Sequence, residues 1–233
     1  MTTSPEAGVR VKICGLRDAE TALAVRDLPI DYIGFVFAPS RRRVTAEQAG
    51  AVIRAVRGAR SASPPPKFVG VFVNPDPDET AEVVRAAPLD GIQLHGTETP
   101  EMCRRFREEL GVFVWKTVPV EDAAGSLSLR EAEKRLGPYE GAVDGVVLDR
   151  PSGGSGMTFP WEAIPVYRRW TSSRGIPLIV AGGLHAGNVG ELLARHRPDV
   201  VDVSSGVETG GVKDPDKIRA FVGRVKLHGT ISG

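Results

Sequence analysis

The stretch Phe68-Val69-Gly70-Val71-Phe72-Val73 contains no polar side chain. A half-exposed strand alternates apolar and polar residues, whereas a strand covered on both faces reads as a continuous apolar run. The run Gly145–Leu148 has the same character. Both stretches therefore predict strands of a parallel sheet that helices cover on its two faces.

Similar runs recur along the whole chain at fairly even spacing. Eight candidate strands begin near Val9, Tyr32, Phe68, Gly91, Val112, Val143, Pro177 and Val200. The segments between them have apolar residues at helical spacing, most clearly within Ala49–Val56 and Ile218–Val225. Strict alternation of strand and helix indicates parallel strands that are joined by crossover helices.

This pattern predicts an α/β fold, a single (β/α)8 TIM barrel with eight parallel strands. The alternative, an open doubly wound sheet, normally carries G-x-G-x-x-G after its first strand, and the sequence lacks this motif. We expect one domain over residues 1–233, with loose termini at residues 1–8 and 229–233. Ser61–Pro66, which ends in three prolines, is predicted to be a stiff connecting loop.

Composition excludes several classes of function. The 233 residues include 30 basic and 29 acidic side chains, so no strongly basic surface favours nucleic acid, and no apolar run is long enough to span a bilayer. Cys14 and Cys103 lie too far apart for a C-x-x-C pair, and the N-terminus does not resemble a secretory signal. We expect a cytoplasmic protein without nucleic-acid or membrane partners. It is a monomer by default, and a dimer is possible.

Candidate functional residues follow the apolar runs, because barrel enzymes build their sites at the carboxyl ends of the strands. Polar residues at these positions are Cys14, Asn74, His95, Asp149 and Ser204. Any one of them could simply cap a strand. Five of them converging on one rim favour a functional site.

Glycine-containing turns follow the last three predicted strands. They are Gly153-Gly154-Ser155-Gly156, Ala181-Gly182-Gly183-Leu184 and Ser204-Ser205-Gly206-Val207. Glycine lets backbone N–H groups approach an anion closely, and the loops after strands seven and eight of barrels often bind phosphate. We therefore predict a phosphorylated small-molecule substrate, with Gly154, Gly156, Gly182, Gly183, Ser204, Ser205 and Gly206 among its contacts.

The residues also carry a family resemblance. Val11–Leu16, Gly34–Phe37 with Ser40-Arg41-Arg42, Val69–Asn74, Gly91–Gly96, Leu148-Asp149, the three glycine turns and Asp202–Glu208 resemble the phosphoribosylanthranilate isomerases of tryptophan biosynthesis in matching order. The similarity covers about residues 9 to 228. It implies an Amadori rearrangement of N-(5-phosphoribosyl)anthranilate that needs no cofactor.

By this resemblance, Cys14 matches the general base, Asp149 the general acid, and Arg42 the arginine that holds the anthranilate carboxylate. A thiol acts as a base only when ionised, so we expect Lys12, on the same strand face, to lower the pKa of Cys14. An acid active near neutral pH needs a raised pKa, which partial burial would give Asp149. Arg41 and Arg43 are expected to be solvated.

Other positions keep open roles. His95 is either a neutral hydrogen-bonded histidine or a substrate contact, and Asp202 is expected to orient its loop. Cys103 lies on the apolar stripe of a predicted helix and is expected only to pack. Pro160 stands where the family commonly has an aspartate, which removes a helix N-cap. The connection after Asp149 is shorter than the family pattern.

Two alternatives compete with this function. A related isomerase of histidine biosynthesis performs the same rearrangement on an aminoimidazole nucleotide, but its base is an aspartate where this chain has Cys14; a dual-substrate enzyme stays open. A non-catalytic barrel that binds a phosphorylated metabolite is the other. The histidines at 95, 185, 196 and 228 show no metal-ligand spacing, so we predict no metal site.

Overall fold

The apolar runs form strands that pair in sequence order and close on themselves. The computed structural model describes residues 8–121, 127–151 and 158–230. Within these ranges the barrel strands are β1 (Arg10–Cys14), β2 (Tyr32–Val36), β3 (Lys67–Phe72), β4 (Gly91–Leu94), β5 (Phe113–Pro119), β6 (Gly145–Asp149), β7 (Leu178–Val180) and β8 (Val200–Val203). All neighbours are parallel, and β8 pairs with β1. The predicted TIM barrel is confirmed.

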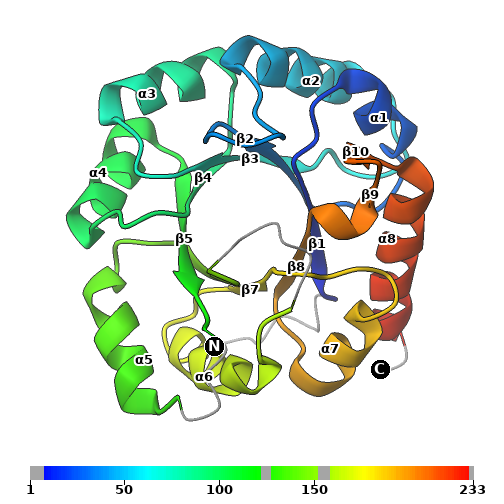
Figure 1. Cartoon of the computed structure of the whole chain (residues 1–233). Helices are drawn as coiled ribbons and strands as arrows, with labels where there is room; N and C mark the ends of the chain where they lie inside the picture. Colours follow the sequence, from blue (N-terminus) through cyan, green and yellow to red (C-terminus); the bar gives the residue numbers. More distant parts are fainter. Residues whose placement is uncertain (1–7, 122–126, 152–157, 231–233) are drawn as a thin grey trace.

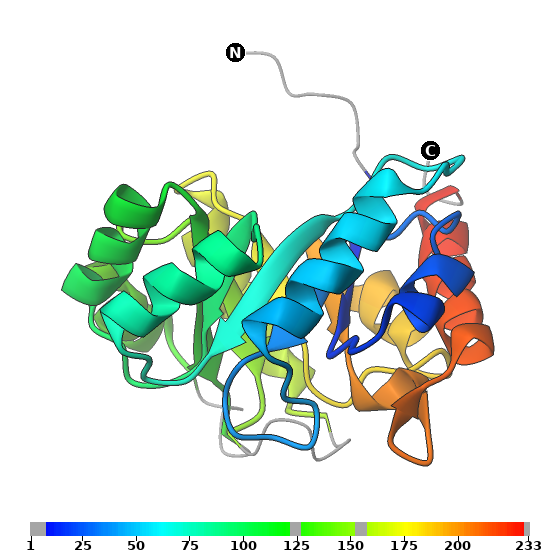
Figure 2. The same ribbon diagram turned by 90° about the horizontal axis from the view of Figure 1, so that it is seen from above.

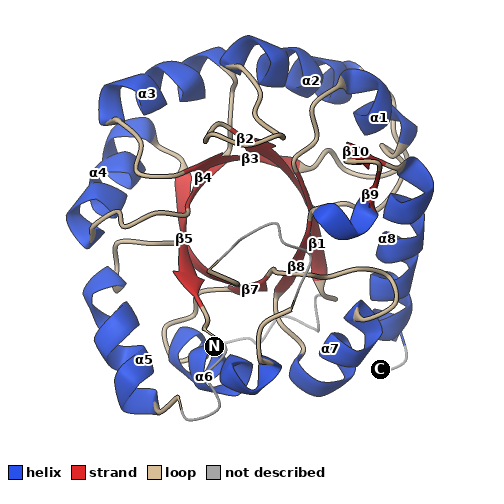
Figure 3. Cartoon of the chain, viewed as in Figure 1, coloured by secondary structure: helices blue, strands red, loops and turns tan. Residues whose placement is uncertain are grey.

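Helices cover the outside of this barrel, as Figure 1 and Figure 3 show in the view down its axis. They are α1 (Ala19–Ala24), α2 (Ala46–Gly58), α3 (Pro77–Ala86), α4 (Pro100–Leu110), α5 (Leu129–Leu136), α6 (Ile164–Ser172), α7 (Val189–His196) and α8 (Pro215–Thr230). Short 3₁₀ turns are η2 (Gly137–Tyr139), η3 (Trp161–Ala163) and η4 (Ser205–Val207). Each helix follows the strand of the same number, which accounts for the alternation in the sequence.

The apolar residues form two separate clusters. The larger lies between the strands and the helices. The smaller fills the barrel interior with Tyr32, Val69, Trp115, Val147, Ile179, Ala181 and Val200. The rings of Tyr32 and Trp115 meet edge to face with centroids 4.9 Å apart. The barrel is therefore packed below its carboxyl end, and this packing forms a floor under any site above it.

Aspartates tie the amino-terminal end of the barrel together in a regular way. Within the described ranges, the residue before each even-numbered barrel strand is an aspartate, and its carboxylate accepts an N–H of the preceding odd-numbered strand. The pairs are Asp31 with Val11, Asp90 with Phe68, Asp144 with Val114 and Asp199 with Leu178, at 2.7–2.9 Å. Each carboxylate also pairs with a cation of an even-numbered helix. This repeated device satisfies strand-end N–H groups away from the carboxyl end.

The segment between β2 and α2 is fixed at both of its ends. Val44 N donates to Val36 O at 2.9 Å. Thr45 then begins α2 with a capping box, in which Thr45 Oγ1 accepts Gln48 N at 3.1 Å and Gln48 Oε1 accepts Thr45 N at 2.8 Å. Arg42 is therefore carried on an anchored loop.

A two-stranded hairpin, β9 (Glu208–Thr209) and β10 (Val212–Lys213), was not predicted. It lies outside the barrel sheet, in the connection between β8 and α8. In Figure 2 this hairpin and the segment after β2 project from the same end of the barrel. The hairpin therefore adds side chains to the end where a site is expected.

Several smaller predictions can be compared with the structure. Ser61–Pro66 connects α2 to β3, as predicted. Pro160 precedes η3 without a side-chain cap, and α6 also lacks one. Helix α8 continues to Thr230, into the segment expected to be loose, while residues 1–7 and 231–233 lie outside the described residues. No helix within the described ranges is long and apolar enough to cross a membrane.

Candidate active site

A cavity of about 440 Å³ opens at the carboxyl ends of the strands. Its lining includes the predicted residues Cys14, Arg42, His95, Asp149, Gly182, Gly183, Ser204 and Ser205, together with Gln93 and Asp202. The barrel therefore brings chain segments that are far apart in sequence to one mouth.

A larger groove of about 730 Å³ lies beside this cavity. The two share Ala38, Pro39 and Val73. The groove is lined by neither Cys14 nor Asp149. We place the chemistry in the smaller cavity, because proton transfer requires titratable groups within reach of the reacting atoms.

Asn74, one of the five polar rim residues, does not join the others. It lines the larger groove, and its Oδ1 accepts Thr97 N at 2.7 Å and Thr97 Oγ1 at 3.1 Å. Its backbone N–H donates to the buried carboxylate of Glu98 at 2.8 Å. Asn74 therefore joins the loops after β3 and β4. The expectation that all five residues share one rim site is wrong at this position.

Cys14 is the last residue of β1, and its side chain fills space that Gly34 leaves on β2. A Cβ at Gly34 would lie 2.9 Å from Cys14 Sγ. Lys12, two residues earlier, is fully buried, and its Nζ lies 2.7 Å from Asp202 Oδ2. The other carboxylate oxygen, Asp202 Oδ1, is buried and has no hydrogen-bond partner among the residues that the structure describes. The lower part of the site is thus a buried ion pair beneath the thiol.

The pKa of Cys14 is shifted in the direction opposite to the predicted one. Burial raises the pKa of the Cys14 thiol more than the positive charge of Lys12 lowers it. Lys12 acts in the expected direction, but desolvation outweighs it because the ammonium is already paired with Asp202. The thiol is therefore protonated at neutral pH in the free site, and the expected net lowering of its pKa is wrong.

Asp149 ends β6 and has the environment that an acid requires. Burial raises the pKa of Asp149 to about 6, against the opposing hydrogen bond from Arg150 N to Oδ1 at 2.7 Å. Gly182 makes room for this carboxyl group: it has φ +77°, and a Cβ there would lie 2.9 Å from Asp149 Oδ1. The predicted effect of partial burial is confirmed.

His95 lies next to Asp149 in the lining of the cavity, with Nε2 3.9 Å from Oδ2. Burial, together with the charges of Lys116 and Lys12, lowers the pKa of His95. The imidazole is therefore neutral at physiological pH. It supplies a polar ring beside the carboxyl group without adding a positive charge.

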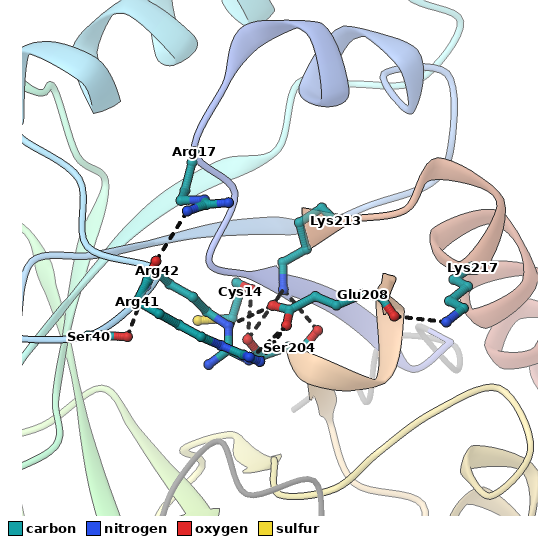
Figure 4. Close-up of polar contacts among 9 residues, drawn as sticks. All are labelled: Cys14, Arg17, Ser40, Arg41, Arg42, Ser204, Glu208, Lys213 and Lys217. Atoms are coloured by element: carbon teal, nitrogen blue, oxygen red, sulfur yellow. Dashed lines mark hydrogen bonds and ion pairs between the residues drawn. The ribbon is translucent and has the colours of Figure 1, made fainter. Parts of the chain in front are cut away.

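Arg42 points toward the hairpin, where Glu208 holds it, as Figure 4 shows. Arg42 Nε lies 2.6 Å from Glu208 Oε1 and Arg42 Nη2 lies 3.0 Å from Oε2. Arg43 is exposed, as expected. Arg41 is mostly exposed but also pairs with Glu208 at 2.8 Å, so the expectation that it is only solvated is incomplete.

Two of the three glycine turns can be placed. Gly182 and Gly183 both have positive φ, which suits glycine. Ser204 and Ser205 reach the same cavity. Gly206 packs instead: a Cβ there would overlap the carbonyl oxygen of Leu184, so this glycine lets the turns after β7 and β8 touch. Gly154 and Gly156, with the rest of Gly153–Gly156, lie outside the described residues.

Ser204 connects Cys14 to the hairpin. Its Oγ donates to Cys14 O at 3.1 Å, and Lys213 Nζ donates to Ser204 O at 2.8 Å. Sequence reasoning missed Lys213, because a lysine in a two-residue strand carries no distinguishing signal. Glu208 lies inside a matching motif, but two of its partners, Arg41 and Arg42, come from a distant segment.

Cys103 and the arrangement of possible metal ligands were also considered in the sequence. Cys103 is fully buried on α4, and burial raises its pKa to about 11, in keeping with a packing role. Across the described ranges, no group of three or more His, Cys, Asp or Glu side chains is arranged to hold a metal ion.

The cavity presents a thiol and a carboxyl group that are able to exchange protons with a bound molecule. An arginine and two glycine-containing turns flank these two groups.

Comparison with known proteins agrees with this chemistry. The family described as N-(5'phosphoribosyl)anthranilate (PRA) isomerase matches residues 11–224. A curated relative from Brevibacillus brevis, named N-(5'-phosphoribosyl)anthranilate isomerase, is 44% identical over 223 residues, which are 94% of each chain. Among solved structures, monomers generated from the dimeric phosphoribosylanthranilate isomerase of Thermotoga maritima superpose with a TM-score of 0.76 at 37% identity, covering 94% of this chain and 99% of that one. A phosphoribosyl anthranilate isomerase in complex with reduced 1-(o-carboxyphenylamino)-1-deoxyribulose 5-phosphate has a TM-score of 0.75 at 35% identity, with the same coverage.

Proposed function

This chain belongs to the N-(5'-phosphoribosyl)anthranilate isomerase family, and on that premise we propose that Cys14 is the general base and Asp149 the general acid of its reaction. The enzyme converts N-(5-phosphoribosyl)anthranilate to 1-(2-carboxyphenylamino)-1-deoxyribulose 5-phosphate in tryptophan biosynthesis. The reaction moves hydrogen within one molecule, so it requires one proton donor and one proton acceptor.

Asp149 donates its proton to the ring oxygen of the ribose. The bond between that oxygen and C1 breaks, and the nitrogen lone pair forms a C1=N iminium ion. A carboxyl group with an ordinary pKa would be almost fully ionised at neutral pH. The raised pKa of about 6 keeps a usable protonated fraction of Asp149.

Cys14, as the thiolate, removes the proton from C2. The electron pair of the C2–H bond becomes the C1=C2 double bond, and the iminium nitrogen accepts the electrons. The resulting enolamine tautomerises to the ketone product. Lys12 beneath the thiol stabilises the thiolate, although burial keeps the resting pKa high.

The ends of the substrate are assigned by charge. The phosphate is placed at Gly182, Gly183, Ser204 and Ser205, where glycine with positive φ exposes backbone N–H groups. Gly206 supports this site by keeping the two turns together. The anthranilate carboxylate is placed at Arg42, on the opposite side of the mouth from Asp149, and His95 lies beside the sugar.

One observation carries this assignment: Cys14 and Asp149 line the same cavity, and Asp149 has the raised pKa of an acid. Growth rescue of a tryptophan auxotroph that lacks the isomerase tests it in cells. Wild-type protein is expected to restore growth, and Cys14→Ala or Asp149→Ala is not. Rescue by either variant at equal abundance would overturn the assignment.

Acceptance of the aminoimidazole nucleotide of histidine biosynthesis is a separate question. Arg42 favours a substrate with a carboxylate on its aromatic ring, so we propose that the anthranilate compound is strongly preferred. Turnover of both ribonucleotides by the purified enzyme measures this preference. A higher kcat/KM for the imidazole compound would contradict it.

The setting of the enzyme is proposed from the same chemistry. The base role requires a free thiol at Cys14, and both described cysteines are free. We propose the cytoplasm, where thiols stay reduced. We propose a monomeric single domain, and sedimentation of the purified protein distinguishes this from a dimer.

A further inference from the structure

Glu208, the first residue of β9, receives three cationic side chains from different parts of the chain. Its carboxylate oxygens lie 2.6 and 3.0 Å from Arg42 Nε and Nη2, 2.7 Å from Lys213 Nζ and 2.8 Å from Arg41 Nη2. The Glu208 side chain is only 5% exposed. Figure 4 shows these cations gathered around the single carboxylate beside Cys14 and Ser204.

The carboxylate is held independently of Arg42. Glu208 pairs with Lys213 across the hairpin, and Lys213 Nζ also donates to Ser204 O. Lys217 Nζ, from α8, donates to the backbone oxygen of Glu208 at 2.8 Å. Burial alone would raise the pKa of Glu208, but the hydrogen bonds from Arg42 and Lys213 outweigh it and lower the pKa to about 2. Glu208 is therefore a fixed anion at every physiological pH.

Arg42 is held between this anion and the backbone of Gly15, which directly follows β1. A Cβ at Gly15 would lie 2.7 Å from Arg42 Cδ, so the aliphatic part of Arg42 lies directly on that glycine. The Nε–Nη2 edge of the guanidinium bonds to Glu208. A guanidinium has a second edge, between its two terminal nitrogens, that also suits a carboxylate. Arg42 lines the cavity.

We propose that Glu208 is a positioning residue that fixes the guanidinium of Arg42 so that its second edge receives the carboxylate of the substrate's aromatic ring. This inference rests on the role of Arg42 in the proposed function. It adds a reason for selectivity: a substrate without a ring carboxylate gains nothing from an oriented Arg42. Glu208 itself contacts no reacting atom.

A purely electrostatic role makes the opposite prediction. If Glu208 only neutralised positive charge, its removal would leave Arg41, Arg42 and Lys213 more attractive to an anion, and the KM for the carboxylated substrate would fall. If Glu208 orients Arg42, its removal lets the guanidinium adopt other rotamers, and the KM rises. The sign of the KM change therefore separates the two roles.

The experiment compares Glu208→Gln, Arg42→Lys and the control Arg41→Ala on N-(5-phosphoribosyl)anthranilate and on N-(5-phosphoribosyl)aniline, which lacks the carboxylate. Glu208→Gln and Arg42→Lys should each raise the KM for the anthranilate compound at least about tenfold, with kcat within about threefold. Neither should change kcat/KM for the aniline compound by more than about threefold. Arg41 is 58% exposed, so its pairing contributes little and its variant should resemble wild type.

A fold-preserving variant guards against loss of structure. Glu208→Gln leaves Lys213 buried without its carboxylate, whereas Glu208→Met with Lys213→Met removes both charges of that pair. Circular dichroism and urea unfolding establish which variants are folded. The double variant also removes the donor to Ser204 O at the proposed phosphate site, which affects both substrates alike. The KM for the anthranilate compound should therefore rise at least about tenfold more than the KM for the aniline compound.

The outcomes are distinguishable. A raised KM in Arg42→Lys with an unchanged or lower KM in folded Glu208 variants overturns the positioning role and leaves the proposed function intact. An unchanged KM in Arg42→Lys overturns the carboxylate assignment itself, and the inference with it. Unfolding of both Glu208 variants assigns this residue to stability and also overturns the inference.

Discussion

Cys14 and Asp149 line one cavity, although they end strands β1 and β6, which are not neighbours in the barrel. Burial raises the pKa of both groups. In the free enzyme near neutral pH, the thiol carries a proton and Asp149 is largely ionised. The reactive arrangement, with the proton on Asp149 and a thiolate at Cys14, is a minor tautomer of that same protonation state.

This relationship predicts the pH dependence of kcat/KM. The minor tautomer is a constant fraction of the singly protonated pair, so kcat/KM should be flat between the two pKa values. Below about pH 6 both groups are protonated, and kcat/KM should fall about tenfold per pH unit. It should also fall above the pKa of Cys14. Initial rates from about pH 5 to about pH 10 measure this profile.

The Asp149→Asn variant serves as its control. Only ionisation of Cys14 matters in that variant, so its small residual kcat/KM should rise with pH through neutrality without a plateau. A wild-type profile with no low-pH limb near pH 6 would contradict the assignment of Asp149 as a titrating partner.

The acid role of Asp149 also has a consequence for stability. The folded state raises the pKa of Asp149 from 3.8 to about 6, so it binds the proton more tightly than the unfolded state. The contribution of Asp149 to the free energy of unfolding should therefore fall as pH rises from about 4 to about 6, by about 2–3 kcal/mol. Asp149→Asn keeps the acceptor for Arg150 N and lacks this penalty.

Urea unfolding tests this point. Asp149→Asn should be more stable than wild type at about pH 8 by about 2–3 kcal/mol and similar at about pH 4. Equal stabilities at both pH values would show that the carboxylate is not destabilised in the folded protein.

Gly182 gives a prediction with a matched control. Alanine at Gly182 places a methyl group 2.9 Å from Asp149 Oδ1 and strains a backbone at φ +77°. Gly175 has φ +67° and nothing within 4 Å of its Cβ position. Both alanine variants should lose about 1–2 kcal/mol of stability. Only Gly182→Ala should also lower kcat/KM, by at least about tenfold. Equal kinetics in the two folded variants would contradict the close packing of Gly182 on the acid.

The strand-end aspartates predict a change in stability without a change in rate. Asp144 accepts Val114 N at 2.9 Å and lies 3.0 Å from Arg107 Nε, at the end of the barrel opposite the site. Asp144→Ala leaves the Val114 N–H unpaired and should lower the free energy of unfolding by about 1–3 kcal/mol. Assays at a temperature where the variant is folded should give wild-type kcat and KM. A fall in kcat would show that this end influences the chemistry.

The barrel could be predicted because its signal is local and repeated. Runs such as Phe68–Phe72 are buried on both faces, and each is followed by a helical pattern; Val73, at the end of the same apolar run, is 45% exposed. The hairpin Glu208–Lys213 escaped prediction because its two-residue strands are too short for periodicity. The strand-end aspartates Asp31, Asp90, Asp144 and Asp199 stand directly before four of the strands, but each bonds to a residue 20 to 30 positions earlier in the chain, which no local pattern indicates.

The site was predicted less completely, because its electrostatics depend on contacts between distant segments. Lys12 could be placed beneath Cys14 from strand alternation, but its pairing with Asp202 on β8 decides how little it lowers the thiol pKa. Asn74 follows a strand like the other rim residues, but its side chain accepts a hydrogen bond from Thr97 N. Pairing between remote segments determines both the thiol pKa and the position of the Asn74 side chain, and no local sequence pattern predicts that pairing.

Single-turnover kinetics on purified Cys14→Ala and Asp149→Ala, with N-(5-phosphoribosyl)anthranilate and with binding of a reduced product analogue measured in parallel, test the assigned proton transfers most directly. Each variant should convert the substrate at least about a hundredfold more slowly than wild type while still binding the analogue. Conversion at the wild-type rate by either folded variant would contradict the account.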